Sequence, residues 1–172
     1  MMAGKSKSQQ RSDCPVSVSL EVLGDRWTLL IVRDLMVRGY RTFREFQRAG
    51  EGIATNILSD RLRKLEAAGI VLTEPSERDG RSVYYRLTEK GIALAPLLLD
   101  LLIWGARHEE TAAPCGLSLQ LEKNREELLL ETHRRWAQHD ATPLIPPFRP
   151  LAEPAKKKRT LTGRTSPKAK QK

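Results

Sequence analysis

The chain has 172 residues, of which 40% are hydrophobic and 30% charged, enough for one domain with a hydrophobic core. Its apolar runs are short, and none approaches the roughly 20 apolar residues that a membrane-spanning helix requires. The basic N-terminus is not followed by an apolar stretch, which excludes a secretory signal peptide. We therefore expect a cytoplasmic protein without a membrane partner.

The formal net charge of +9 is concentrated at the two ends of the sequence. Residues 154–172 contain eight Lys and Arg residues and no acidic residue, and residues 1–13 contain three bases and one acid. The rest of the chain is close to neutral, so the overall basicity does not by itself indicate nucleic-acid binding. The basic tail favours a flexible arm that raises non-specific affinity for DNA.

Residues that could support catalysis or metal binding are scarce. Cys14 and Cys115 are far apart in the sequence, and burial habits favour a small, semi-buried apolar role for each. The histidines lack metal-binding spacing, and there is no nucleophile elbow, phosphate-binding glycine loop or metal motif. We therefore expect neither an enzyme nor a cofactor. The three histidines are His108, His133 and His139.

The first half of the sequence predicts a polar, disordered segment followed by helices. Residues 1–13 are polar, basic and without periodicity. Pro15 suits the first turn of a helix over residues 16–23, which Gly24 ends. A second helix, over about residues 26–37, has an apolar stripe that would face the core.

Two short helices joined by a glycine-containing turn are predicted next. Thr42 and Glu45 match a capping box at the start of the first, over residues 42–48. The second begins near Thr55 and ends at Gly69. This is the pattern of a helix-turn-helix.

Strand-like alternation then predicts a hairpin of residues 70–74 and 81–87. The turn signal between the strands is Asp79-Gly80. A helix-turn-helix followed by such a hairpin indicates a winged helix-turn-helix, a mainly α fold with a small β-hairpin wing. Its predicted span is residues 14–110.

The C-terminal part begins with a helix that Thr88 caps and that runs to about residue 108. Pro96 lies inside it and predicts a kink or a restart. The helix is apolar around almost its whole circumference, so it needs cover on both sides, and a second copy of the chain is the expected source for one. A further helix is predicted over residues 118–139, and the prolines from residue 142 onward predict a disordered segment over 142–172.

A polar face on the helix over residues 55–69 is the candidate DNA-reading surface. Its leucines form one apolar stripe, and the opposite side offers amide, hydroxyl and guanidinium groups to base edges and phosphates. An ordinary solvated helix face would look similar, but the order of helix, turn, helix and arginine-flanked hairpin favours binding of double-stranded DNA. The candidate residues are Thr55, Asn56, Ser59, Asp60, Arg61, Arg63 and Lys64 on the helix and Arg78 and Arg81 beside the wing turn.

Several short motifs follow one another in this part of the sequence: CPV at 14–16, LGDRWTLLI at 23–31, RDL at 33–35, FREF at 43–46, GI at 52–53, LSDRL at 58–62, LEAAGIV at 65–71 and YRLTEKG at 85–91. Together and in this order they resemble the HxlR-type winged helix regulators over about residues 14–107.

The resemblance implies a bacterial, cytoplasmic, homodimeric regulator that binds inverted-repeat operators. The helix over 55–68 would be the recognition helix, and the first helix and the long helix after Thr88 would form the dimer interface. The resemblance identifies no small-molecule effector. The rival interpretation is a winged helix used for protein–protein contact, whose binding would be insensitive to salt, whereas DNA binding weakens steeply with salt.

The sequence departs from the family pattern just before the recognition helix. The family often has Ser-Pro where this chain has Ala54-Thr55, so we expect the helix cap to move to Thr55. The wing is also longer than is common in the family. Cys14 matches a cysteine that some members use to sense oxidants or electrophiles, and the helix start and preceding bases would lower its pKa.

Overall fold

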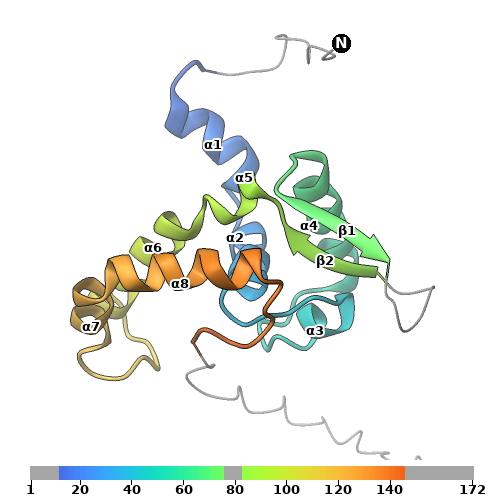
Figure 1. Cartoon of the computed structure of the whole chain (residues 1–172). Helices are drawn as coiled ribbons and strands as arrows, with labels where there is room; N and C mark the ends of the chain where they lie inside the picture. Colours follow the sequence, from blue (N-terminus) through green and yellow to red (C-terminus); the bar gives the residue numbers. More distant parts are fainter. Residues whose placement is uncertain (1–11, 76–82, 146–172) are drawn as a thin grey trace, which may run out of the picture.

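The computed structural model describes residues 12–75 and 83–145, which form a group of helices with a two-stranded hairpin at one edge (Figure 1). The predicted mainly α fold with a small β-hairpin is confirmed. The predicted disordered segments, 1–13 and 142–172, fall largely outside the described residues. The elements are α1 (Pro15–Leu23), α2 (Arg26–Met36), α3 (Phe43–Gln47), α4 (Thr55–Ala67), β1 (Val71–Pro75), β2 (Val83–Leu87), α5 (Glu89–Ile92), α6 (Ala95–His108), α7 (Leu117–Lys123) and α8 (Arg125–Ala137).

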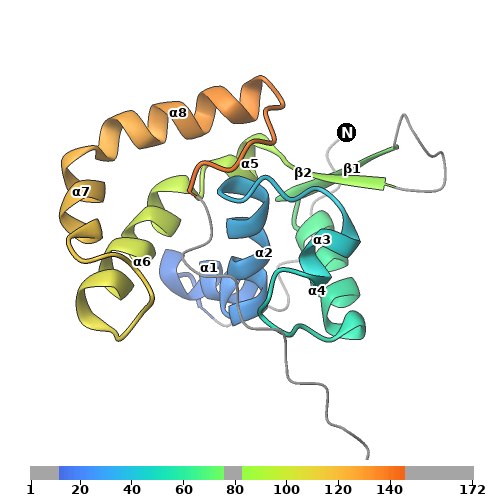
Figure 2. The same cartoon turned by 90° about the horizontal axis from the view of Figure 1, so that it is seen from below.

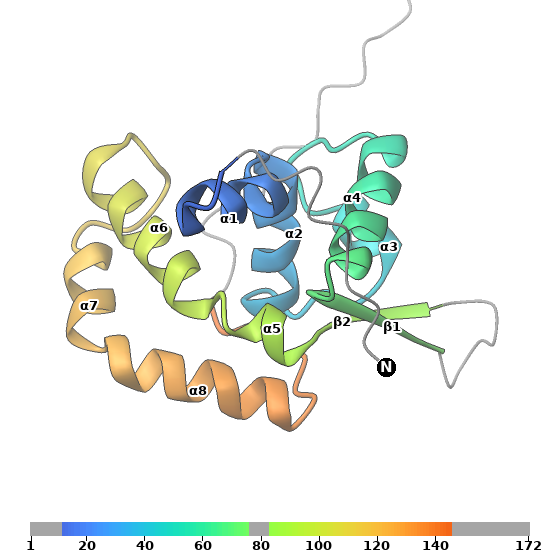
Figure 3. The same cartoon turned by 90° about the horizontal axis from the view of Figure 1, so that it is seen from above.

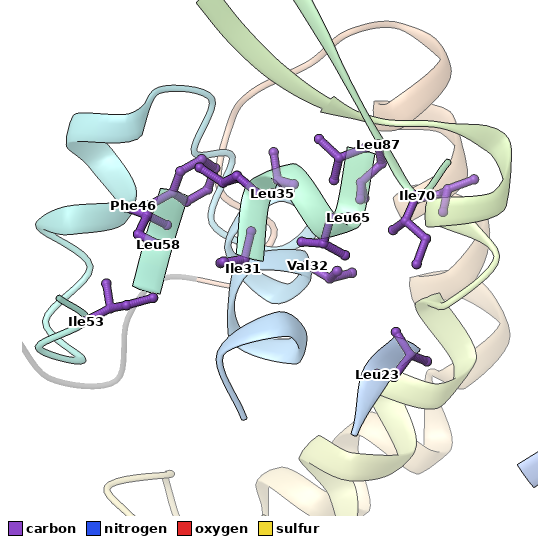
Figure 4. Packing of buried hydrophobic residues seen from close by; sticks show 13 residues of the cluster. Leu23, Ile31, Val32, Leu35, Phe46, Ile53, Leu58, Leu65, Ile70 and Leu87 are labelled. Carbon is purple, nitrogen blue, oxygen red and sulfur yellow. The ribbon is translucent and has the colours of Figure 1, made fainter. Parts of the chain in front are cut away.

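The main core lies among α2, α3 and α4. The leucines of α4 form the expected buried stripe, and Figure 4 shows Leu58 and Leu65 beside side chains of α2 and Phe46 of α3. Fully burying one such side chain stabilises the fold by about 1.5–3 kcal/mol. The stripe therefore fixes the rotation of α4 about its own axis. Its buried members are Leu58, Leu62 and Leu65.

Helix α3 begins with the predicted capping box. The Thr42 hydroxyl accepts a hydrogen bond from the Glu45 amide (3.3 Å), and the Glu45 carboxylate accepts one from the Thr42 amide (2.8 Å). Burial raises the pKa of Glu45, but hydrogen bonds from the Arg41 and Thr42 amides outweigh it and hold that pKa below its ordinary value.

Helix α4 begins differently from the prediction. Ala54 is the residue before the helix, with the extended backbone of an N-cap, and no side chain caps the first turn. Thr55 is already helical, so the expectation that it caps the helix was wrong. The N-cap position is therefore one residue earlier than the hydroxyl side chain of Thr55 indicated.

The hairpin pairs β1 and β2 antiparallel, from Val71 opposite Leu87 to Pro75 opposite Val83. The first strand begins one residue later than predicted, because the Ile70 amide still donates to the Leu65 carbonyl at the end of α4, at 2.9 Å. The Asp79-Gly80 turn lies outside the described residues.

The helix predicted after Thr88 is divided into α5 and α6. Thr88 caps α5 by accepting a hydrogen bond from the Gly91 amide at 3.1 Å. The helix stops at Ala93 and restarts so that Pro96 lies in the first turn of α6, where its missing N–H is harmless. The predicted restart is confirmed.

The single helix predicted over residues 118–139 is instead two, which meet at Asn124. Helix α7 packs along α6, and α8 turns back across the molecule (Figures 2 and 3). Ion pairs join α6 to this extension: Arg107 with Glu122 at 2.6 Å, and Asp100 with Arg125. A second, smaller core forms between them, built on Leu99, Ile103 and Leu121.

The far end of α8 is attached to the wing. The Trp136 indole donates a hydrogen bond to the Leu87 carbonyl of β2 (2.8 Å), and Arg86 donates one to the Trp136 carbonyl (3.1 Å). Arg86 also pairs with Glu74 of β1 at 3.5 Å. The last turn of α8 is therefore attached to the end of β2 that precedes α5.

After α8 the chain crosses the end of α2. The Leu144 amide donates to the Val37 carbonyl at 2.8 Å. A Cβ atom at Gly39, whose φ is +71°, would lie 1.8 Å from the Ala141 carbonyl oxygen. Only glycine fits here, both because φ is positive and because the backbones are so close. Among the described helices, none combines the length and apolar composition of a membrane span.

Candidate nucleic-acid interface

Helix α4 presents a continuous polar face to solvent. Thr55, Asn56 and Ser59 are exposed along its first two turns, and the side chains of Arg63 and Lys64 follow with 74% and 62% of their surface exposed. In Figure 3, α4 lies on the opposite side of the molecule from α7. The structure therefore brings these five candidate residues together on one open surface.

Three cations of α4 surround one carboxylate. Asp60 lies 3.0 Å from the Lys64 ammonium, 3.3 Å from the Arg61 guanidinium and 3.9 Å from that of Arg63. The hydrogen bond from Lys64, together with the attraction of the nearby cations, outweighs burial and lowers the pKa of Asp60. Asp60 is therefore ionised at neutral pH and orders the cations while leaving their outer surfaces in solvent.

Arg61 is placed differently from the other two cations. Only 22% of its side chain is exposed, and its Nε atom lies 3.2 Å from the Asp25 carboxylate at the start of α2. That Nε atom is buried and has no acceptor with hydrogen-bond geometry in the described part of the chain, so the contact is mainly charge attraction. Arg61 thus joins α4 to α2 more than it faces solvent.

Asp25 is a structural residue of this site that the sequence analysis missed. Its carboxylate accepts hydrogen bonds from the Trp27 and Thr28 amides, both at 3.0 Å, and caps α2. An Asp after Gly24 and before an amphipathic run is a recognisable N-cap signal. Its second role, facing Arg61 across the helix packing, has no signal in the sequence.

The other candidate residues lie away from α4. Arg78 and Arg81 fall outside the described residues. Cys14 and Cys115 are free and exposed, so the expectation of semi-buried cysteines was wrong. Cys14 immediately precedes α1, and hydrogen bonds from the Ser17 and Val16 amides lower the pKa of its thiol.

Three packed helices, with an antiparallel hairpin directly after the third, define a winged helix-turn-helix protein. The chain belongs to the HxlR-like helix-turn-helix family, whose model matches residues 22–113. It is a transcriptional regulator of that family. Helices α7 and α8 lie beyond the matched residues.

Similar proteins extend this result. The uncharacterized HTH-type transcriptional regulator YybR of Bacillus subtilis (strain 168) is 34% identical over 110 residues, which are 64% of this chain and 87% of YybR. PA1607, provisionally assigned as a transcription factor, has a crystal structure with a TM-score of 0.55 and 43% identity over 60% of this chain and 71% of its own. The oxidised form of the redox regulator HypR has a TM-score of 0.51 and 35% identity over 57% of this chain and all of its own.

Substituting Asp25 separates its two roles. Asp25→Ala removes the cap of α2 and should lower the free energy of unfolding by about 1 kcal/mol, whereas Asp25→Asn keeps the cap and should stay within about 0.5 kcal/mol of the wild type. Urea denaturation of the full chain measures both. If Asn were as damaging as Ala, the attraction to Arg61 would be the main contribution of Asp25, contrary to this assignment.

Proposed function

We propose that the protein is a sequence-specific DNA-binding regulator that binds an inverted-repeat operator as a homodimer and inserts α4 into the major groove. The observation that carries the proposal is the orientation of α4, whose leucines are buried while its amide, hydroxyl and cationic groups are exposed. A helix about 10–12 Å across fits the major groove, which is about 12 Å wide. The proposed DNA-binding unit spans residues 14–110 and acts in the cytoplasm.

The first two turns of α4 are the proposed base-reading part. Asn56 and Ser59 are exposed and offer the donor and acceptor groups that match base edges. Thr55 lies beside them, and because Ala54 provides no side-chain cap, the first amides of α4 can meet a DNA phosphate.

The remaining candidates have proposed supporting roles. Arg63 and Lys64 would contact phosphates, and Asp60 would keep them ordered. Arg61 would hold α4 against α2 through Asp25. Arg78 and Arg81 are proposed to contact the backbone or the minor groove beside the wing.

A second copy of the chain is the proposed cover for an exposed apolar surface on α1 and α6, which we call the α1–α6 surface. Figures 2 and 3 place both helices on the same side of α2. Helices α7 and α8 cover other sides of α6, so they do not fill this role. A two-fold dimer would place its two α4 helices about one DNA turn apart. The exposed side chains are Val16 and Leu20 of α1 and Leu97, Leu101 and Trp104 of α6.

Alanine substitutions on α4 test the DNA-binding proposal, with an operator selected from random DNA as the probe. Asn56→Ala should cost about 1–3 kcal/mol on the operator and relax its sequence preference. Arg63→Ala should weaken binding to every DNA sequence. It should also reduce, by about one, the slope of the logarithm of the binding constant against the logarithm of the salt concentration. Lys123→Ala, an exposed cation on α7, is the matched control and should change neither. Binding that is insensitive to salt would instead support the protein–protein interpretation.

Charged substitutions on the α1–α6 surface test the dimer. Leu20→Glu and Trp104→Glu should each shift the chain toward monomers, because each puts a charge into an apolar interface. Leu119→Glu on α7, which is 67% exposed in the wild type, should leave the association unchanged. Sedimentation velocity measures the species present. An unchanged dimer in both interface variants would exclude this surface.

The structure supports a second, regulatory proposal, which is that Cys14 senses oxidants. Its thiol is exposed and has a lowered pKa, so more of it is the reactive thiolate at neutral pH. The likeness to a redox regulator, HypR, points the same way.

Oxidation of Cys14 should therefore change operator affinity. Hydrogen peroxide should alter the affinity of the wild type, and dithiothreitol should reverse the change. Cys14→Ser should abolish the response, whereas Cys115→Ser should keep it because that thiol lies far along the chain. An unchanged response in Cys14→Ser would remove the sensing role.

A further inference from the structure

A cavity of about 720 Å³ lies between α2, α6 and α8. Its walls are aliphatic: Leu29 and Leu30 come from α2, Leu98 and Leu102 from α6, Leu129 from α8, and Ile145 from the segment after α8. The cavity opens to solvent. Small-molecule sites measure roughly 300–1,000 Å³, so the cavity is the size of a ligand site.

The α8 wall of the cavity is attached to neighbouring elements at both ends. At one end α6 is joined to the C-terminal extension by the ion pairs Asp100–Arg125 and Arg107–Glu122. At the other end Trp136 fastens α8 to β2. These contacts set the position of α8 beside α6 and β2.

Charged groups at the cavity favour an anionic ligand. The guanidiniums of Arg26, Arg33 and Arg38 and the carboxylate of Glu51 line it. Arg33 binds Glu51 at 2.9 Å and the buried Asp34 at 2.7 Å, and Arg38 binds Asp34 at 3.1 Å. Two carboxylates therefore compensate Arg33 and Arg38. Arg26, which stacks over the Trp27 ring at 4.4 Å and has no ion pair among the described residues, is the cation that remains beside the apolar walls.

We propose that this cavity binds an effector, an apolar molecule that carries one carboxylate, and that the bound effector changes DNA affinity by moving α8 and, through Trp136, the wing. The inference rests on the proposed function, because it describes the regulation of that DNA binding. The α2 and α6 walls lie within the residues that the family model matches, whereas the α8 wall lies outside them and comes from the C-terminal extension.

Two other occupants of the cavity are conceivable, the segment after Ile145 and a second copy of the chain, and both fit its lining less well than an amphipathic carboxylate does. The segment that follows Ile145 is strongly basic, with a single acid, Glu153, among residues 146–172, so its charge does not match the uncompensated cation of Arg26. A second copy has its proposed contact on the α1–α6 surface, of which Leu101 lies at the edge of the cavity while Val16, Leu20, Leu97 and Trp104 do not line it. An amphipathic carboxylate matches both the aliphatic walls and the cations.

Fluorescence titration of the full chain with 8-anilinonaphthalene-1-sulfonate, an apolar anion, tests the site. The wild type should bind the dye saturably, and dodecanoate should displace it better than dodecan-1-ol. Leu129→Trp fills the cavity and should weaken dodecanoate binding by about tenfold or more. Its neighbour Leu130 is 73% exposed and does not line the cavity, so Leu130→Trp is the matched control and should bind normally.

Two further variants keep the test decisive. Arg26→Ala should weaken dodecanoate by about tenfold, the loss of one charge-assisted hydrogen bond, and leave dodecan-1-ol unchanged. Leu102→Phe fills the cavity less severely and serves if Leu129→Trp does not fold. Equal dye binding by Leu129→Trp and Leu130→Trp, or dye binding that appears only when the chain ends at Ile145, would overturn the proposal.

Operator binding is measured separately in the same proteins. Dodecanoate should change the DNA affinity of the wild type and leave that of Leu129→Trp unaltered. Intact DNA binding without saturable ligand binding would refute the ligand site but not the proposed DNA-binding function. Ligand binding without any DNA binding would refute the proposed function and leave the cavity as a binding site.

Discussion

The leucine stripe of α4 packs against α2 and α3, and this contact decides which side of α4 meets the solvent. Leu58, Leu62 and Leu65 lie on one side of the helix, so their burial turns the opposite side outward. Asp25 secures the same packing from the other direction, because it caps α2 and attracts Arg61 of α4. The polar face of α4 is thus a consequence of core packing. Every role proposed for that face depends on the stripe.

Helix α6 connects the remaining parts of the molecule because its sides meet different partners. One side packs on α7, another lines the cavity with α2 and α8, and a third exposes Leu97 and Trp104. A helix that is apolar all round needs such cover on every side. A shift of α6 relative to α8 would therefore alter the cavity, the proposed dimer surface and the support of the wing together. Effector binding and operator binding could be coupled through this one helix.

Local patterns in the sequence predicted much of the fold, but they did not predict the contacts between segments that are distant in the sequence. The capping box at Thr42, the leucine stripe of α4 and the restart at Pro96 depend on neighbouring residues, and all three are confirmed. The break at Asn124 was missed because the apolar pattern runs across it. The hydrogen bond from Trp136 to the Leu87 carbonyl of β2 was missed because it joins residues about fifty positions apart, and no local pattern encodes such a contact. On the candidate site, the polar face of α4 was foreseen, whereas the burial of Arg61 against Asp25 was not.

Cleavage of DNA from a reagent attached to α4 tests the central claim most directly. An iron chelate would be coupled to Ser59→Cys in a chain that carries Cys14→Ser and Cys115→Ser, and the protein would be bound to its selected operator. If α4 lies in the major groove of each half-site, cleavage should occur in two symmetric clusters about one helical turn apart. The same reagent on Leu119→Cys of α7 should cleave weakly. Cleavage from α7 but not from α4, or no localised cleavage from α4, would contradict the account.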